Sequence, residues 1–235
     1  MRTAVILPVK RFAQAKQRLG ASIADAARER LARAMVTDVL AALARAHSIE
    51  RTIVVTCEPS VAAQARAGGA LVLRDAAQAG QSAAVRIGVA RARAEGFERV
   101  LCIPGDCPAL EPGELDALLA AGGGGKGPGA AARREVVIVP DRHGTGTNGL
   151  LLTPPEVIEP SFGPGSCARH RALARDARAE LRLEHPPSLL LDIDTGEDLA
   201  ALRARLANAT RSAPCTRSVL GQAERDPILT TSTTG

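Results

Sequence analysis

Short apolar runs alternate with longer amphipathic stretches along most of the chain, an order typical of an α/β fold. The run Thr3–Val9 is continuously apolar and opens into a loop, as expected of a buried parallel strand. Apolar residues then recur at helical spacing from Asp25 to Ala46, which predicts a long helix. Further strands are predicted at Thr52–Thr56, Ala70–Leu73, Arg99–Ile103, Val136–Val139, Gly149–Leu152 and Ser188–Asp192. Further helices are predicted at Ala83–Glu95, Pro112–Ala121, from about Ser166, and at Gly196–Leu206.

A chain of 235 residues is long enough for one α/β domain, which we place at residues 1–207. The core must be built mainly from Ala, Val, Leu and Ile, because the sequence has no Trp or Tyr and only three Phe. Residues 208–235 are rich in Ser, Thr and Arg without apolar periodicity, so we predict a disordered C-terminal tail.

The net charge of +5 and the pI of about 9.3 favour anionic ligands. Nucleic acid is not an expected partner, because the Arg residues are dispersed and almost no aromatic side chains are available to stack on bases. No apolar run approaches the roughly 20 residues that cross a bilayer. Lys10 and Arg11 follow Met1–Val9 directly, which is not the order of a secretory signal, so a cytoplasmic protein is expected. A homodimer is compatible with the sequence, which does not determine the oligomeric state.

Four cations occupy the loop after the first predicted strand: Lys10, Arg11, Lys16 and Arg18. In open α/β sheets, ligands bind beyond the carboxyl ends of the strands, and backbone N–H groups with Lys or Arg suit a triphosphate there. An ordinary solvated basic loop explains the same charges.

Carboxylates follow two other predicted strands. Asp106 comes directly after Arg99–Ile103 and is flanked by Gly and Pro, a rigid placement that suits a hard Mg²⁺ ligand. Turn formation and helix capping are the alternative role for an Asp-x-Pro segment. Near Ser188–Asp192, we assign Asp192 as the second metal ligand and Asp194 as its structural partner, with Thr195 or Asp194 capping the next helix.

Two Gly-rich segments, Asp141–Gly149 and Phe162–His170, are candidates for binding a second anion. The second leads through Gly-Pro-Gly-Ser into a helix, whose free N–H groups and dipole would form an anion site with the Ser166 hydroxyl. Thr147 would add a hydroxyl from the first segment. Ordinary Gly turns are the alternative, and His170 is expected to be an exposed helix residue.

Taken together, these segments resemble the phospholactate, phosphoenolpyruvate and phosphoglycerate guanylyltransferases of coenzyme F-420 biosynthesis. The resemblance covers about residues 3–206 and rests on five motifs in this order: Pro-Val-Lys…Ala-Lys-x-Arg-Leu, Gly-Asp-x-Pro-x-Leu, Asp-Arg-x-Gly-x-Gly-Thr-Asn, Phe-Gly-x-x-Ser-x-x-x-His and Asp-x-Asp-Thr. The chain departs from the family at Gly80-Gln81-Ser82, where Gly-Leu-Asn is usual, and at Gly196, where Pro is usual.

The resemblance implies a single-domain, three-layer α/β/α fold with a mixed, mostly parallel sheet, the glycosyltransferase-A-like nucleotidyltransferase fold. It implies a Mg²⁺ cofactor held by Asp106 and Asp192. The cations that would neutralise the phosphates are Lys10, Lys16 and Arg18. The residues expected at the nucleotide are Lys10, Gly80 and Ser82, and those expected at the phosphorylated acid are Thr147, Gly163, Ser166 and His143.

The implied partners are small molecules: GTP and a phosphorylated three-carbon acid, namely phosphoenolpyruvate, 2-phospholactate or 3-phosphoglycerate. The implied reaction transfers GMP to that acid and releases pyrophosphate. Two alternatives keep the fold: a molybdenum-cofactor or sugar-phosphate nucleotidyltransferase, and a nucleotide-binding protein without catalytic activity.

Overall fold

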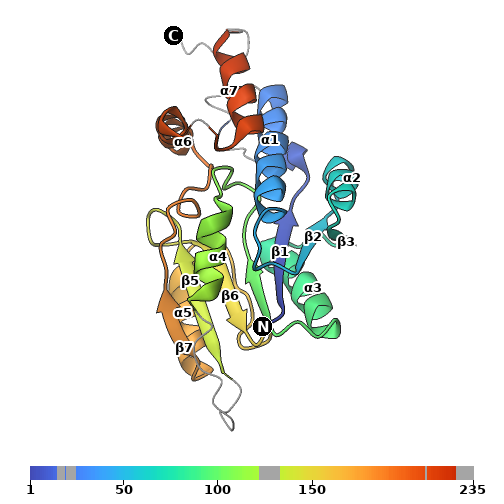
Figure 1. The fold of residues 1–235 in the computed structure, drawn as a ribbon, viewed down its shortest axis with the longest axis vertical. Coiled ribbons are helices and arrows are strands. Elements are labelled where there is room, and N and C mark those ends of the chain that lie inside the picture. Colours follow the sequence, from blue (N-terminus) through green and yellow to red (C-terminus); the bar gives the residue numbers. More distant parts are fainter. Residues whose placement is uncertain (15–18, 20–24, 122–132, 210, 226–235) are drawn as a thin grey trace.

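A seven-stranded sheet in the order β3-β2-β1-β4-β6-β5-β7 runs through the computed structural model, which describes residues 1–14, 19, 25–121, 133–209 and 211–225 (Figure 1). The strands are β1 (Thr3–Val9), β2 (Arg51–Thr56), β3 (Leu71–Arg74), β4 (Arg99–Cys102), β5 (Glu135–Pro140), β6 (Thr147–Thr153) and β7 (Glu180–Leu183). Only the pairings made by β6 are antiparallel. The predicted mixed, mostly parallel sheet is therefore confirmed.

Helices cover both faces of this sheet. One core cluster joins the sheet to α1 (Asp25–Leu43), α2 (Pro59–Ala67), α4 (Pro112–Ala120), α6 (Gly196–Asn208) and α7 (Pro214–Arg225). The cluster on the other face contains α3 (Gln81–Ala94) and α5 (Ser166–Asp176). A short 3-10 turn, η1 (Phe12–Gln14), follows β1. The arrangement confirms the three-layer α/β/α fold. None of the helices in the described ranges has the length and apolar character to span a membrane.

Strand alternation explains how one sheet serves two cores. In β1, Val5 and Leu7 point into the α1 side, whereas Ala4 and Ile6 point into the α3 side. All four are fully buried. Because successive side chains of a strand face opposite ways, a strand covered on both faces is apolar throughout, and this is why Thr3–Val9 could be recognised as a strand.

The predicted strand at Ser188–Asp192 is wrong. This segment consists of turns and irregular backbone, although Leu189 is fully buried. A short apolar run only indicates burial, and a packed loop satisfies it as well as a strand does. The last strand in the described part of the chain is instead β7, an edge strand with Leu181 and Leu183 37% and 40% exposed, so it lacked the apolar signal that marks a buried strand.

The predicted disorder of the C-terminal region is wrong for residues 214–225, which form α7. This helix lies beside α1 (Figure 1). The carboxylate of Asp38 on α1 is buried and accepts the backbone N–H groups of Cys215 and Thr216, at 3.0 and 2.8 Å. The stabilising partner lies far away in sequence, so a local pattern could not indicate it. Residues 226–235 lie outside the described residues.

We expect Asp38→Ala to lower the free energy of unfolding by about 2 kcal/mol, because two charge-assisted hydrogen bonds to the start of α7 are lost. Urea unfolding measures this change. Glu29→Ala, an exposed change on the same helix, is the matched control and should have little effect. Equal stability of the two variants would show that the contact of Asp38 with α7 does not stabilise the protein.

Candidate active site

A cavity of about 400 Å³ lies beyond the carboxyl ends of the parallel strands. Its walls come from the segments that follow β1, β2, β3 and β4, together with α1, the start of α3 and the segment before α6. The polar residues among them include Lys10, Arg11, Asp75, Gln78, Gln81, Asp106 and Asp194. This is the edge at which open α/β sheets bind ligands. Lys10, Gly80 and Asp106 therefore line one cavity, and their roles at nucleotide and metal stay predictions.

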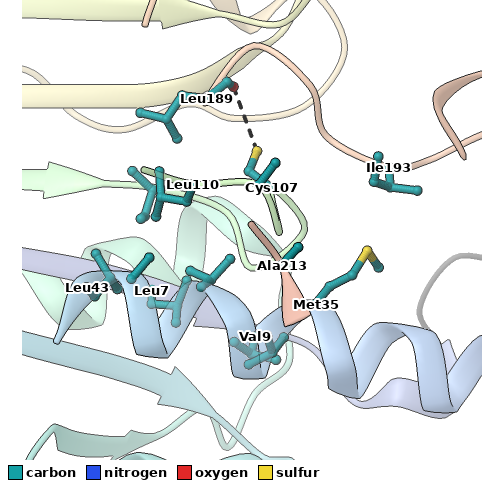
Figure 2. Packing of buried hydrophobic residues seen from close by; sticks show 14 of the residues in the cluster. Leu7, Val9, Met35, Leu43, Cys107, Leu110, Leu189, Ile193 and Ala213 are labelled. Carbon is teal, nitrogen blue, oxygen red and sulfur yellow. Dashed lines mark hydrogen bonds between the residues drawn. The ribbon is translucent and has the colours of Figure 1, made fainter. Parts of the chain in front are cut away.

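Asp106 and Asp192 are brought together from segments that lie far apart in the sequence. The backbone N–H of Ile193 donates to the carbonyl of Asp106, at 3.1 Å. The thiol of Cys107 donates to the carbonyl of Leu189, at 3.7 Å, and Figure 2 shows this contact within the buried cluster. These two bonds hold the segment of Asp106 against the segment of Asp192. Asp192 does not lie on a strand, contrary to the prediction, and the shared metal site stays a prediction.

Asp192 is electrostatically strained by this arrangement. Burial, the nearby charge of Asp106 and, less strongly, that of Asp194 raise the pKa of Asp192 to about 6. The side-chain amide of Asn148 donates to Asp192 Oδ1, at 3.0 Å, and opposes the rise. Two carboxylates that disfavour each other's charge form a site where a cation is stabilising. Asn148 was not singled out in the sequence, although it ends the Gly-x-Gly-Thr-Asn motif.

This donor set fits Mg²⁺. Among the described residues there is no cluster of three or more His, Cys, Asp or Glu side chains that could hold a metal. Mg²⁺ does not need one, because it is commonly bound by one or two carboxylates while substrate phosphates and water supply the remaining oxygens. Asp106 and Asp192 would hold the ion, and assigning it to them remains a prediction.

Asp194 lies at the cavity wall, while its neighbours start α6. The Thr195 hydroxyl accepts the N–H of Asp198, and the Asp198 carboxylate accepts the N–H of Thr195, which is a capping box. Thr195 rather than Asp194 is therefore the cap. Asp198 also pairs with Arg142, at 2.8 Å, and this bond ties the first Gly-rich segment to α6.

The Asp141–Gly149 segment forms a turn that positions its last residues. The carboxylate of Asp141 accepts the N–H groups of His143, Thr145 and Gly146, so it closes a tight turn. A Cβ on Gly146 would lie only 2.5 Å from Asp141 Oδ2, which explains why glycine is needed there. His143 is exposed in this turn and does not line the cavity within the described residues.

Thr147 and Ser166 meet in the interior. Their hydroxyl oxygens are 3.1 Å apart, and Thr147 Oγ1 lies 3.0 Å from His170 Nδ1. Ser166 and His170 are four residues apart on α5 and thus share one helix face. His170 has no exposed surface, so the expectation of an exposed helix residue is wrong. The sequence feature that could have indicated its burial is its spacing of four residues from Ser166, which places both on one helix face.

The N–H groups of Ser166 and Cys167 at the start of α5 are not free to bind an anion. The N–H of Ser166 donates to the carbonyl of Gly163, and that of Cys167 donates to Thr145. The expectation that these groups are free is therefore wrong for both. The loop before α5 instead depends on Gly163 and Gly165, whose φ angles of 111° and 71° favour glycine.

The Ser82 hydroxyl accepts the N–H of Phe162, at 2.8 Å, so Ser82 connects the start of α3 to the loop before α5 and is not a cavity-wall residue in the described chain. Its proposed nucleotide contact remains a prediction. Lys16 and Arg18 lie outside the described residues.

The fold is that of nucleotidyltransferases of the glycosyltransferase-A-like type. A nucleotidyl transferase from Methanothermobacter thermautotroptrophicus shares the fold, with a TM-score of 0.62 and 20% identity, over 89% of this chain and 99% of that one. The family described as "Guanylyl transferase CofC like" matches residues 3–212, and the chain belongs to this family.

Relatives in this family are closely similar over nearly their whole length. A phosphoenolpyruvate guanylyltransferase from Conexibacter woesei is 49% identical over 222 residues, which are 94% of this chain and 96% of the relative. One from Sphaerobacter thermophilus is 37% identical over 202 residues, which are 86% of this chain and 93% of the relative. The resemblance inferred from the five motifs is thereby confirmed.

Proposed function

We propose that the protein transfers GMP from GTP to phosphoenolpyruvate and releases pyrophosphate, in a Mg²⁺-dependent step of coenzyme F-420 biosynthesis. The observation that carries the proposal is the convergence of Asp106 and Asp192 beside a cavity that also contains Lys10. The names of the relatives support guanylyl transfer and favour phosphoenolpyruvate over 2-phospholactate and 3-phosphoglycerate.

In the proposed reaction, a phosphate oxygen of the acceptor attacks the α-phosphorus of GTP in line. The new bond joins this oxygen to the α-phosphorus, and the bond to the β-phosphate oxygen breaks, so pyrophosphate leaves with the bonding electrons. A phosphate monoester is already ionised near neutral pH, so no general base is required. The task of the protein is to position two anions that repel each other and to neutralise their charge.

The residues divide this task by position. Lys10 lies in the cavity and would neutralise phosphate charge. Asp106 and Asp192 would hold Mg²⁺, which supplies Lewis-acid stabilisation of the phosphate oxygens when bound. Gly80 is the N-cap of α3 at the cavity wall with φ of 97°, and the absence of a side chain there would let the nucleotide approach the backbone. Lys16 and Arg18 would add positive charge, and Thr147, Gly163, Ser166 and His143 would serve the acceptor.

We expect pyrophosphate release from the purified protein with Mg²⁺ only when GTP and phosphoenolpyruvate are both present. Testing each nucleoside triphosphate against each of the three acids measures this. A clear preference for 2-phospholactate or 3-phosphoglycerate would correct the acceptor. Release with a sugar phosphate or a molybdenum-cofactor precursor alone would support another nucleotidyltransferase, and GTP binding without release would support a non-catalytic role.

A further inference from the structure

Both ring nitrogens of the buried His170 are engaged, and this determines its tautomer. Nε2 lies 2.9 Å from the backbone nitrogen of Ser161, and Nδ1 lies 3.0 Å from Thr147 Oγ1. A backbone N–H can only donate, so Nε2 must accept. Burial, and then the charge of Arg169, lower the pKa of His170 to about 4, so the ring is neutral near pH 7. A neutral imidazole has one donor nitrogen and one acceptor, and Nδ1 therefore carries the proton and donates it to Thr147.

This tautomer determines whether both hydroxyl protons of Thr147 and Ser166 have a hydrogen-bond acceptor. Thr147 and Ser166 together carry two hydroxyl protons, and one of them lies between their oxygens. Had Nδ1 been an acceptor, the second proton would have gone to His170. Because Nδ1 donates, that proton has no acceptor among the hydrogen bonds of the described chain. The pair is 6% and 1% exposed, and a buried O–H without an acceptor is costly.

The hydroxyl pair is connected to the candidate metal site through the backbone of β6. Thr147 directly precedes Asn148, whose side chain donates to Asp192. On the opposite side, Phe162 packs edge-on against His170 with ring centroids 5.2 Å apart, and its N–H donates to Ser82 at the start of α3. The hydroxyl pair is therefore joined through β6 to a residue that contacts Asp192, and through His170 to the loop that contains Gly163.

We propose that His170 is a positioning residue for the acceptor: its Nδ1–H makes Thr147 an acceptor, so that the Thr147–Ser166 pair offers its remaining O–H to an anionic oxygen of the phosphorylated acid. This inference rests on the proposed function. His170 does not touch the substrate, and it acts through the two hydroxyl groups.

Three substitutions separate the two hydrogen bonds of the ring. His170→Phe removes both. His170→Asn keeps a donor near the position of Nδ1, and His170→Gln keeps an acceptor near the position of Nε2. We expect the KM for phosphoenolpyruvate to rise about tenfold in His170→Phe and His170→Gln, and to stay near the wild-type value in His170→Asn. The KM for GTP should stay unchanged in all three variants.

The matched control is Ala174→Gly, which weakens α5 at a buried position one turn further on without touching the network. It should leave the KM for phosphoenolpyruvate unchanged. An equal rise in this control, an equal rise in both KM values, or recovery in Gln instead of Asn would overturn the proposal, because each would indicate a structural role for His170.

Long-range ¹H–¹⁵N NMR of the histidine rings tests the tautomer without any activity. A proton on Nδ1 of His170 at neutral pH supports the proposal, and a proton on Nε2 overturns it. Inactivity of the wild type towards all three acids would overturn the proposed function, and with it the acceptor role of the pair, while the spectrum would still decide the tautomer.

Discussion

Asp106→Asn should lower kcat/KM for guanylyl transfer by roughly a thousandfold, the largest effect we expect from any single substitution. A bound metal contributes several kcal/mol to phosphoryl-type transition states, and a loss of about 4 kcal/mol corresponds to this factor. Asn keeps the shape of the side chain but removes the charge that would hold Mg²⁺. Steady-state pyrophosphate release at saturating Mg²⁺ measures the loss.

Stability distinguishes this effect from misfolding. The charge of Asp106 helps to raise the pKa of Asp192, which means that the two carboxylates repel each other when no cation is present. Asp106→Asn should therefore not lower the free energy of unfolding measured in EDTA. Glu156→Gln, which removes one charge from a surface pair with Arg93, is the matched control and should keep full activity. Turnover of Asp106→Asn near that of the control would refute the metal assignment.

The second large effect is a loss of stability in acid caused by His170. Its pKa is lowered to about 4 in the folded protein, compared with an ordinary value of 6.5. The unfolded chain therefore binds a proton at a pH at which the folded protein does not. The stability that the neutral His170 contributes is complete above pH 6.5. This contribution declines as the pH falls through that value, and it is lost at about pH 4. The loss attributable to His170 is about 3 kcal/mol.

Asp192 acts in the opposite direction over much the same range. Its pKa is raised to about 6 from 3.8, so the folded protein binds this proton more readily than the unfolded chain, and stability is gained as the pH falls from 6 towards 4. The two contributions nearly cancel in the wild type. The contribution of His170 therefore appears as a difference between variants and not as the slope of a single curve.

Urea unfolding in EDTA between pH 7 and pH 4 measures that difference. The stability of the wild type relative to His170→Phe should fall by about 3 kcal/mol across this range, because only the wild type carries the imidazole. His143→Gln, a change at an exposed histidine, should follow the wild type throughout. A constant difference between wild type and His170→Phe would show that His170 is protonated equally in the folded and unfolded states.

The site was predictable where chemistry coincides with a local pattern. Asp106 follows a buried strand and Lys10 follows another, and parallel strands bring their carboxyl ends to one edge, so their common cavity could be inferred. Asn148 and Cys107 could not be assigned in this way. Each acts through a bond to the segment around Leu189 and Asp192, and such a bond depends on the packing of distant elements.

The sequence alone determined the alternation of strands and helices, the buried central strands and the family, because hydrophobic periodicity and short motifs are local properties. Tertiary structure decided the features that depend on a distant partner. Ser188–Asp192 is a packed loop, α7 forms against Asp38, and His170 is buried between Ser161 and Thr147. The free energy of burial and of a hydrogen bond depends on what lies opposite a residue, and only the assembled domain supplies that neighbour.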